Sequence, residues 1–512
     1  MSIFDYKTKP MQHQESNLHK MLGRYAFALF WEMGCGKSKP IVDEISCLFA
    51  EEKIDCVLII SDKGCYLNWE TSELPKHMWD ALPYLPFVYK SSSVRSKKEI
   101  LGMCRQPFNP FEFLPIVCMN VEAFSGDSAS DVINAIAKRF VNIYMVVDES
   151  TSIKNASAVR TKKITAVGKR AKYRRILTGT PMTQNPLDLY AQMNFLDPKI
   201  LGFDSFFAFR NRYGVMETQY MGPGRTFQKL IGFKNQEELL SKIAPHCSRL
   251  LKTECLDLPP KVYTTRYVEL TKEQKLMYDK IKAEGLLQLK DSTATATTAL
   301  GVVIKLRQLT SGFVKDDDGV ITRVDNNRAS VLAEVLDQVQ GKAIIWCAFK
   351  EDVERVCSML GCNEAVHYYG DTSDEERKEA LEQFNDPNSD IRFFVGTAKT
   401  GGKSLTLTIA NTVIYYSNDY SLEARLQSED RAHRYGQKNT VTYVDLVSPG
   451  TVDETVLAIL RGKEDMAKMT LARLTEIIEG DYPVIASEAM AVPDFWAPLC
   501  APDAKAQPQE SR

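Results

Sequence analysis

The chain has 512 residues, which is too long for one hydrophobic core and predicts two or three domains. Its 64 Lys and Arg residues and 66 Asp and Glu residues give a net charge of −2, which excludes a globally basic, histone-like protein but allows a local basic surface. No apolar run of about 18 residues and no secretory signal occur, which argues against a membrane protein. The 12 cysteines form no C-x-x-C pair, which argues against a zinc cluster or a disulfide framework and favours a reducing compartment.

Short apolar runs alternate with helical stretches along the chain, in two series. The first series comprises residues 26–30, 57–60, 116–119 and 143–147, and the second comprises 343–347, 391–395, 412–416 and 441–446. Strands that are apolar on both faces are typical of parallel sheets covered by helices. The pattern therefore predicts an α/β protein with two parallel sheets.

Composition changes between the two series and again near the end. Residues 199–250 are rich in Phe, Tyr and Gly, and the Asp-Leu-Pro-Pro segment at 257–260 indicates a linker, because consecutive prolines cannot continue a helix. A helix is expected over 271–289, a hairpin around 316–319 and a long helical tail over 452–479. The expected domains are a first α/β domain (1–198), an aromatic and helical insertion (199–250), a linker and helical segment with a hairpin (251–320), a second α/β domain with a C-terminal helix (321–480) and a disordered tail (481–512).

A glycine-containing turn, Glu-Met-Gly-Cys-Gly-Lys-Ser at 32–38, follows the first predicted strand and precedes a predicted helix. Glycines allow backbone N–H groups to surround phosphates, Lys37 can reach the terminal phosphates, and Ser38 can bind Mg²⁺. A plain glycine-rich turn is the alternative, and Trp31 stands where such loops usually have their first glycine. The residues expected to bind nucleotide here are Met33, Gly34, Cys35, Gly36, Lys37 and Ser38.

Two further segments carry candidate residues directly after a strand. Asp148 can hold Mg²⁺ and Glu149 can deprotonate an attacking water, although acidic pairs in this position also serve as helix caps. The hydroxyls and glycine of Thr178, Gly179 and Thr180 can sense phosphate occupancy, although such clusters are often plain turns.

A basic helix lies in the second half. Arg431 and Arg434 are three residues apart, so they are predicted to share one helical face, and their guanidinium groups suit phosphate oxygens. A solvated charged helix is the alternative. His433 has no partner at metal-ligand spacing and is expected to be structural.

Together these motifs resemble the helicase superfamily two ATPases and, among them, the Swi/Snf-type DNA-dependent translocases. The resemblance covers residues 8–465, with the motifs in the family's order: Gln14 in the Q motif, 32–38 in motif I, 68–70 in motif Ia, 148–155 in motif II, 177–181 in motif III, 399–402 in motif V and 427–437 in motif VI. Two departures occur. Motif II reads Asp-Glu-Ser-Thr where the family usually has Asp-Glu-Ala-His or Asp-Glu-Gly-His, and Ser404 and Thr406 replace the usual Gly and Asn of motif V.

The resemblance implies two RecA-like lobes, separated by helical insertions, that bind ATP and Mg²⁺ between them. It assigns adenine reading to Gln14, and Mg²⁺ binding to Ser38 and Asp148. The implied catalytic residues are Lys37, Asp148, Glu149, Gln427, Arg431 and Arg434, and the implied coupling residues are Thr178, Gly179, Thr180 and Gly402. The implied nucleic-acid contacts are Lys63, Asn120, Lys154, Asn155, Thr400 and Gly401. The Lys- and Arg-rich stretch 160–175 is expected to add a positive surface, with a solvated helix face as the alternative.

The function that the resemblance implies is an ATP-driven translocase on double-stranded DNA that remodels or displaces bound protein. A strand-separating DNA or RNA helicase and a nucleic-acid-binding scaffold with weak ATPase activity are the alternatives. Double-stranded DNA is the expected partner, single-stranded nucleic acid is the second choice, and protein partners stay open. The chain is expected to be a minimal monomeric member that works in the cytoplasm of a bacterial cell or a phage-infected host.

Overall fold

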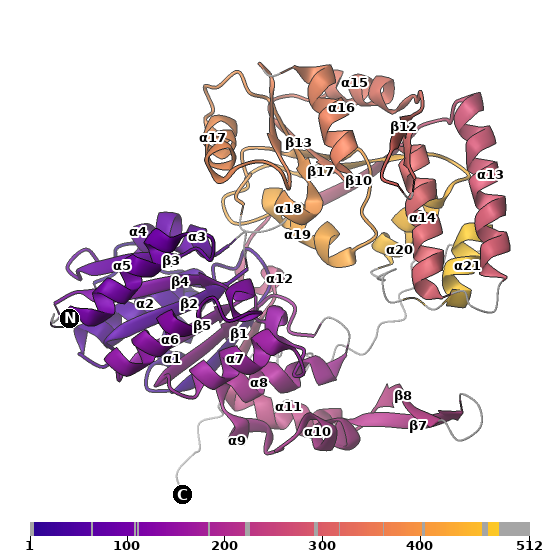
Figure 1. Ribbon diagram of the computed structural model, residues 1–512. Helices are drawn as coiled ribbons and strands as arrows, with labels where there is room; N and C mark the ends of the chain where they lie inside the picture. The colour runs from indigo at the N-terminus through magenta and orange to yellow at the C-terminus, as the bar shows by residue number, and fades with distance from the viewer. Residues whose placement is uncertain are drawn as a thin grey trace, which may run out of the picture. The chain divides into compact units, whose positions relative to one another are not determined.

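The computed structural model describes residues 5–62, 65–106, 109, 112–182, 185–220, 226–290, 295–316, 318–361, 363–401, 405–462, 469 and 471–480. The chain divides into two compact units, an N-terminal unit that ends at Leu256 and a C-terminal unit that begins at Asp257 (Figure 1). The site predictions at Lys63 and Gly402, the departure at Ser404 and the predicted tail over 481–512 lie outside the described residues.

A parallel sheet forms the centre of the N-terminal unit. Within the described residues it has seven strands in the order β3-β4-β2-β5-β6-β1-β9, and every neighbouring pair is parallel. The strands are β1 Ala26–Trp31, β2 Cys56–Ser61, β3 Tyr84–Tyr89, β4 Leu114–Asn120, β5 Ile143–Asp148, β6 Tyr173–Leu177 and β9 Cys247–Leu250. Their carboxyl ends therefore meet at one edge of the sheet, where ligands bind in open α/β folds.

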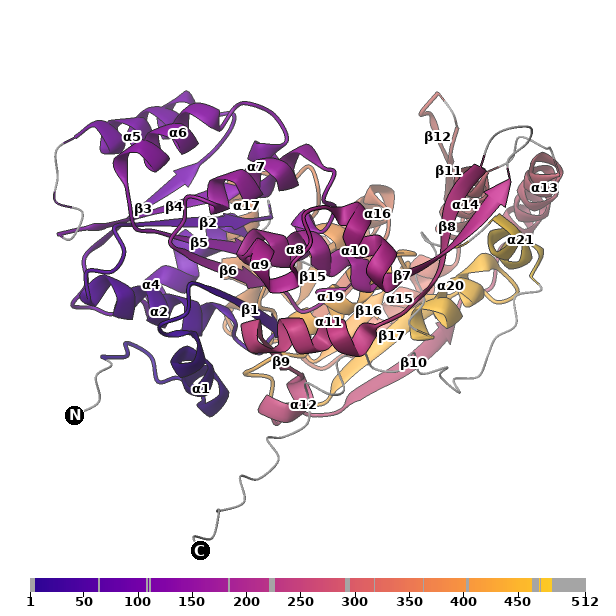
Figure 2. The same cartoon turned by 90° about the horizontal axis from the view of Figure 1, so that it is seen from below.

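Helices cover both faces of this sheet (Figures 1 and 2). Side chains alternate between the faces along each strand, so Phe27 and Leu29 enter one hydrophobic core while Ala28 and Phe30 enter the other. The helical segments are α1 Gln12–Met21, α2 Ser38–Ala50, α3 Tyr66–Asn68, η1 Trp69–Glu73, α4 Leu74–His77, α5 Val94–Arg105, η2 Val121–Phe124, α6 Ser130–Arg139, η3 Ser150–Ile153, α7 Val159–Gly168, η4 Pro186–Asp188 and α8 Leu189–Leu196.

A helical region with one long hairpin follows α8 in the same unit. Its elements are α9 Pro198–Leu201, α10 Phe206–Tyr213, β7 Gly214–Tyr220, β8 Thr226–Phe233, α11 Gln236–Ile243, η5 Ala244–His246 and α12 Lys252–Cys255. The antiparallel β7–β8 hairpin extends away from α10 and α11 (Figures 1 and 2). The helical character expected for the insertion 199–250 is present in α11, which spans residues 236–243.

The C-terminal unit contains a second parallel sheet. In the part of the chain that is described, its order is β10-β17-β16-β13-β15-β14, with all neighbours parallel. The strands are β10 Lys261–Tyr267, β13 Ala343–Cys347, β14 Ala365–Tyr368, β15 Phe393–Thr397, β16 Thr412–Tyr415 and β17 Val441–Val447. Its helices are α13 Lys272–Leu289, α14 Ala296–Thr310, α15 Arg328–Asp337, α16 Lys350–Leu360, α17 Asp374–Asn385, α18 Ala398–Gly401, α19 Leu422–Ala432, α20 Val452–Arg461 and α21 Leu471–Glu479.

The prediction of an α/β protein with two parallel sheets is confirmed. The predicted hairpin is also present, as β11 Phe313–Lys315 paired with β12 Ile321–Arg323. The prediction of one long helical tail over 452–479 was wrong, because α20 ends at Arg461 and α21 begins at Leu471. Gly462 follows α20, and glycine is a poor helix former.

Candidate nucleotide and nucleic-acid site

The glycine turn (residues 32–38) connects the carboxyl end of β1 to the start of α2. Gly34 and Gly36 have φ angles of 87° and 72°, a left-handed conformation that side chains disfavour and glycine adopts freely. The Lys37 ammonium group donates to the carbonyl oxygens of Trp31 (3.0 Å) and Glu32 (3.4 Å). Lys37 therefore folds back over the inside of its own turn, the place where a phosphate-binding lysine is required.

Helix α1 holds the glycine turn from outside. The Gln14 side-chain amide donates to the carbonyl of Gly36 (3.1 Å), and its oxygen accepts the N–H of Met11 (2.8 Å). The neighbouring His13 ring lies 2.9 Å from the carbonyl oxygen of Cys35. Gln14, for which adenine reading is predicted, is thus a direct partner of the glycine turn, and a β-carbon at Gly36 would lie only 2.4 Å from its amide nitrogen.

The Asp148 carboxylate is oriented by three donors at the end of β5. The indole N–H of Trp69 (2.9 Å) and the hydroxyl of Ser61 (3.4 Å) reach Oδ2, and the N–H of Glu149 (3.0 Å) reaches Oδ1. Burial raises the pKa of Asp148, whereas the Trp69 bond and the positive charge of Lys37 lower it. Sequence reasoning placed Trp69 in motif Ia but missed this contact, because no sequence signal links it to a residue 79 positions away.

Asp148 is an acidic group that burial makes costly to ionise, and Ser38 is a hydroxyl residue at the start of α2. Both offer the oxygen ligands that Mg²⁺ prefers. Asp148 and Ser38 are the residues that would hold the ion. Within the described residues, no group of three or more His, Cys, Asp or Glu side chains is placed to hold a metal ion. The pair Asp148 and Ser38 matches Mg²⁺ sites, which use one or two protein ligands together with water and substrate phosphates.

Glu149 and the predicted coupling residues are directly connected. Glu149 has a left-handed backbone (φ 51°, ψ 61°), which is uncommon for a non-glycine residue and is typical of functional sites. Its carboxylate accepts a hydrogen bond from the Thr178 hydroxyl (3.3 Å), which in turn accepts the N–H of Thr180 (3.1 Å). Motif III therefore bonds to the predicted catalytic base.

Gly179 brings the same segment against the glycine turn. A β-carbon there would lie 3.2 Å from the backbone nitrogen of Met33 and 3.3 Å from the carbonyl oxygen of Trp31. Arg249 of β9 donates to the carbonyls of Phe30 (2.7 Å) and Gly179 (3.2 Å), and so joins the two segments. Arg249 was missed by sequence reasoning, because β9 is short and half-exposed and has no motif signature.

The motif VI arginines converge on one carbonyl in the C-terminal unit. Arg431 (3.2 Å) and Arg434 (2.9 Å) both donate to the carbonyl oxygen of Leu405, and Arg431 also donates to that of Gln427 (2.9 Å). The prediction of a shared helical face was wrong, because α19 ends at Ala432 and Arg434 lies beyond it. The two guanidinium groups nevertheless come together, because both reach back to the same loop. His433 bonds to the carbonyl of Pro259 (2.8 Å).

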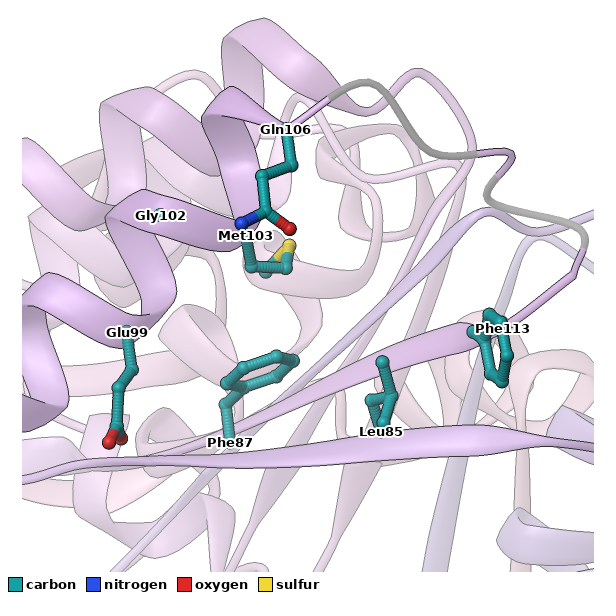
Figure 3. Close-up of a pocket in the computed structure, with 7 residues that line it drawn as sticks. All are labelled: Leu85, Phe87, Glu99, Gly102, Met103, Gln106 and Phe113. Atoms are coloured by element: carbon teal, nitrogen blue, oxygen red, sulfur yellow. The ribbon is translucent and has the colours of Figure 1, made fainter.

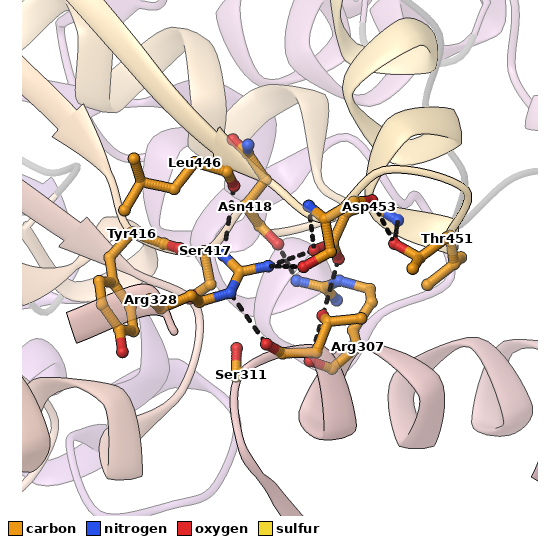
Figure 4. A network of polar contacts seen from close by, with 12 residues as sticks. Arg307, Ser311, Arg328, Tyr416, Ser417, Asn418, Leu446, Thr451 and Asp453 are labelled. Atoms are coloured by element: carbon orange, nitrogen blue, oxygen red, sulfur yellow. Dashed lines mark hydrogen bonds and ion pairs between the residues drawn. The ribbon is translucent and has the colours of Figure 1, made fainter. Parts of the chain in front are cut away.

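A buried polar network in the C-terminal unit fixes the loop after β16 (Figure 4). Arg328 donates to the carbonyl of Thr310 (2.9 Å) and forms an ion pair with Asp453, and Arg307 donates to the carbonyl of Asn418. The adjacent Asp419 pairs with Lys399 of motif V (3.0 Å) at the start of α18, which also carries Thr400 and Gly401. The network therefore supports the position of motif V.

The described nucleic-acid candidates of the N-terminal unit lie at the end of β4 and directly after η3. Asn120 ends β4 and accepts the N–H of Glu122 (3.0 Å), and Asn155 accepts both the N–H (3.0 Å) and the hydroxyl (2.8 Å) of Ser157. Lys154 directly follows η3. Asn120 shares the carboxyl edge of the sheet with the Asp148 site, while its role in binding stays a prediction.

The prediction of a positive surface over 160–175 was wrong for Arg175, whereas Lys162, Lys169 and Arg170 are exposed. Arg175 is completely buried and forms an ion pair with Glu44, and burial lowers the pKa of the neighbouring Arg174. Arg160 bonds to Glu122 (2.6 Å) and Lys163 bonds to Asp127 (2.7 Å). The physical reason is that β6 lies inside the sheet, so its arginines are not part of the basic face of α7.

One further pocket, of about 400 Å³, lies between β3 and α5 (Figure 3). Its lining includes Leu85, Phe87, Met103 and Phe113, and none of its lining residues belongs to a predicted motif.

Among the described helices, none is long and apolar enough to cross a membrane.

Comparison with known proteins places these motifs in a family. Residues 13–312 match the SNF2-related domain, and residues 327–436 match the helicase conserved C-terminal domain. An uncharacterized ATP-dependent helicase of Mycoplasma genitalium is 26% identical over 448 residues, which cover 86% of this chain and 40% of that protein. The human SWI/SNF-related matrix-associated actin-dependent regulator of chromatin subfamily A member 1 is 30% identical over 346 residues, which cover 63% of this chain and 31% of that protein.

Among solved structures, the Sulfolobus solfataricus SWI2/SNF2 ATPase core in complex with dsDNA is 24% identical, with a TM-score of 0.40 and coverage of 90% of this chain and 92% of that chain. The chain spans 40% or less of the length of the two curated relatives described above. The resemblance predicted from the motifs is confirmed by the domain match, which extends over more than half of the residues. The chain therefore belongs to the SNF2-related family and carries its helicase C-terminal domain.

Proposed function

We propose that this protein is an ATP-driven translocase on double-stranded DNA that remodels or displaces bound protein. The observation that carries the proposal is the set of hydrogen bonds within the N-terminal unit. Gln14 bonds to the glycine turn, and Thr178 bonds to Glu149. A binding turn, a predicted base and a coupling segment that contact one another form the ATP-hydrolysing half of such a motor.

The residues around the glycine turn take distinct roles in this proposal. Backbone N–H groups of the turn and Lys37 bind the phosphates of ATP, and Ser38 and Asp148 hold Mg²⁺, which when bound neutralises developing phosphate charge. Glu149 accepts the proton of the attacking water. The Thr178 hydroxyl bonds to the same carboxylate, so a change at Glu149 during hydrolysis is transmitted to motif III.

The C-terminal unit supplies the opposing charge. Arg431 and Arg434, with Gln427 beside them, complement the γ-phosphate in the transition state, as guanidinium groups do in related phosphoryl transfers. ATP bound between two lobes drives movement only if it binds their closed and open arrangements with different affinity. Such alternation moves a strand of DNA that contacts both lobes.

Double-stranded DNA is the proposed substrate because two lines of support point to it. Relatives are named as a probable DNA helicase and as a regulator of chromatin. The candidate contacts Asn120, Lys154, Asn155, Thr400 and Gly401 suit phosphate rather than base recognition, so binding should weaken with salt and show little sequence preference. In this proposal the N-terminal unit contacts DNA through Asn120, Lys154 and Asn155, and the C-terminal unit does so through Thr400 and Gly401 of α18.

ATPase rates with no polymer, duplex DNA, single-stranded DNA and RNA test the proposal, with Lys37→Ala as the inactive control. Stimulation by duplex DNA without displacement of a labelled strand is the expected result. Strand displacement would instead support the helicase alternative. Absence of turnover under all four conditions would refute an ATP-driven motor and leave the scaffold alternative.

A further inference from the structure

Two cysteine thiols meet behind the glycine turn of the N-terminal unit. The sulfur of Cys35, between the two glycines of the turn, lies 3.4 Å from the sulfur of Cys255, which ends α12. The Cys35 side chain is completely buried, whereas Cys255 is partly exposed. The pair is therefore accessible from the Cys255 side.

Backbone contacts hold α12 against the turn. Strand β9 is paired in parallel with β1, with Leu250 opposite Trp31. The N–H of Glu32 donates to the carbonyl of Leu250 (2.9 Å), and the Glu32 carboxylate accepts the N–H of Lys252 (2.8 Å). The approach of the two sulfurs thus follows from the pairing of β1 with β9 and from the bonds of Glu32, which fix the segments that lead into both cysteines.

The environment of Cys255 favours its thiolate, which is the reactive form of cysteine. The hydrogen bond with Cys35 lowers the pKa of Cys255 and outweighs burial and the negative charges of Glu254 and Glu32, which raise it. At Cys47 and Cys357 burial dominates instead, and it raises their pKa values to about 12 and about 11. Cys255 is therefore suited to react with an oxidant.

We propose that Cys35 and Cys255 form an oxidisable dithiol through which a hydroperoxide controls the glycine turn. The Cys255 thiolate attacks the outer oxygen of the hydroperoxide ROOH, the O–O bond breaks, and the sulfenic acid and, after protonation, the alcohol ROH form. The Cys35 thiol then attacks the sulfenic sulfur, which forms the disulfide and releases water. The two sulfurs are oxidised by two electrons and the peroxide is reduced by two.

The disulfide would displace the turn. Bonded sulfurs lie about 2.05 Å apart, so the separation of 3.4 Å must shorten by more than about 1 Å. Gly34 and Gly36 flank Cys35 and allow the backbone to move there. Displacement of binding groups by about 1 Å can lower a reaction rate by about 10²-fold. The consequence for turnover rests on the proposed ATPase function, whereas disulfide formation does not.

The experiment uses the full chain, reduced with dithiothreitol, desalted and treated with hydrogen peroxide. Peptide mapping by mass spectrometry without reduction detects a peptide that links residues 35 and 255. We expect this peptide to appear, kcat/KM for ATP to fall by about 10²-fold, and dithiothreitol to restore it. Cys255→Ser should retain the turnover of the reduced protein and lose the peroxide response, and the matched control Cys357→Ser should retain both.

Three outcomes would overturn the inference: absence of the linked peptide, unchanged kcat/KM when the peptide is present, and equal peroxide sensitivity in Cys255→Ser. A reduced protein without ATPase activity would refute the proposed function instead. In that case the linked peptide and the loss of binding of a fluorescent ATP analogue on oxidation still test the dithiol.

Discussion

Replacement of Arg175 by methionine should destabilise the N-terminal unit strongly. The Arg175 guanidinium is completely buried and bonds to both carboxylate oxygens of Glu44, one of them at 2.9 Å. It also donates to the carbonyls of Arg24 (2.8 Å) and Arg174 (2.8 Å). Tyr144 donates to the same carboxylate (2.5 Å). The ion pair therefore joins α2, which follows the glycine turn, to β6, which precedes motif III.

The magnitude follows from what the substitution leaves behind. Arg175→Met keeps an apolar stem but leaves the Glu44 carboxylate buried without its counter-ion. Removal of one partner from a buried ion pair costs about 3–5 kcal/mol. With an m-value of about 2–3 kcal/mol/M for urea, the unfolding midpoint of the N-terminal unit should fall by about 1–2.5 M. The double variant Glu44→Gln/Arg175→Met should recover much of this loss, because no unpaired charge remains buried.

Hydrogen exchange read by mass spectrometry at increasing urea measures this effect in the full chain. Peptides from β5 and β6 report on the N-terminal unit, and peptides from β13 and β15 provide an internal reference. Arg170→Met is the matched control, since Arg170 is an exposed arginine of the same basic stretch. Its stability should change by about 0.5 kcal/mol or less. An Arg175→Met midpoint equal to that of Arg170→Met, together with weaker DNA binding, would refute the buried ion pair and restore the predicted positive surface.

Four further outcomes are expected. Glu149→Gln should abolish ATP turnover while retaining ATP binding, because glutamine still accepts the Thr178 bond but cannot take a proton; turnover at the parent rate would exclude Glu149 as the base. Arg434→Ala should lower turnover by about 10³-fold or more, and a much smaller loss would exclude it as the arginine finger. Gly36→Ala should weaken binding of a fluorescent ATP analogue, because its φ of 72° and a contact of 2.4 Å with Gln14 both oppose a side chain; an unchanged Kd would contradict this. Burial lowers the pKa of His77 to about 4, so the folded N-terminal unit keeps this ring neutral while the unfolded chain gains a proton below about pH 6.5. The stability that the neutral ring contributes above pH 6.5 is thus lost as pH falls toward 4. In the parent protein the urea midpoint should therefore fall between pH 7 and pH 5, and His77→Asn should reduce this fall. An equal fall in the parent and in His77→Asn would show that His77 does not contribute.

The strands predicted from sequence are all interior or well-buried strands of the two sheets. Apolar runs such as 57–60 and 343–347 reveal them, because both faces of a central parallel strand are covered. The two series omitted the interior strand β6, in which Arg174 and Arg175 interrupt the apolar run. They also omitted the edge strands β3, β9, β10 and β14. Their exposed positions, as in β3 and β10, interrupt the apolar pattern. An edge strand is recognisable only when its neighbour is known.

The same distinction holds for the site. Residues 32–38 and 148–149 were proposed from sequence alone, because a phosphate-binding turn and an acidic pair after a strand are patterns of neighbouring residues. Three contacts were not predicted from sequence: those of Trp69 with Asp148, Arg249 with Gly179 and Cys255 with Cys35. Each depends on the order in which distant strands pair. Local conformation is encoded by neighbouring residues, whereas burial of a charge or the meeting of two thiols follows from packing across the whole sheet.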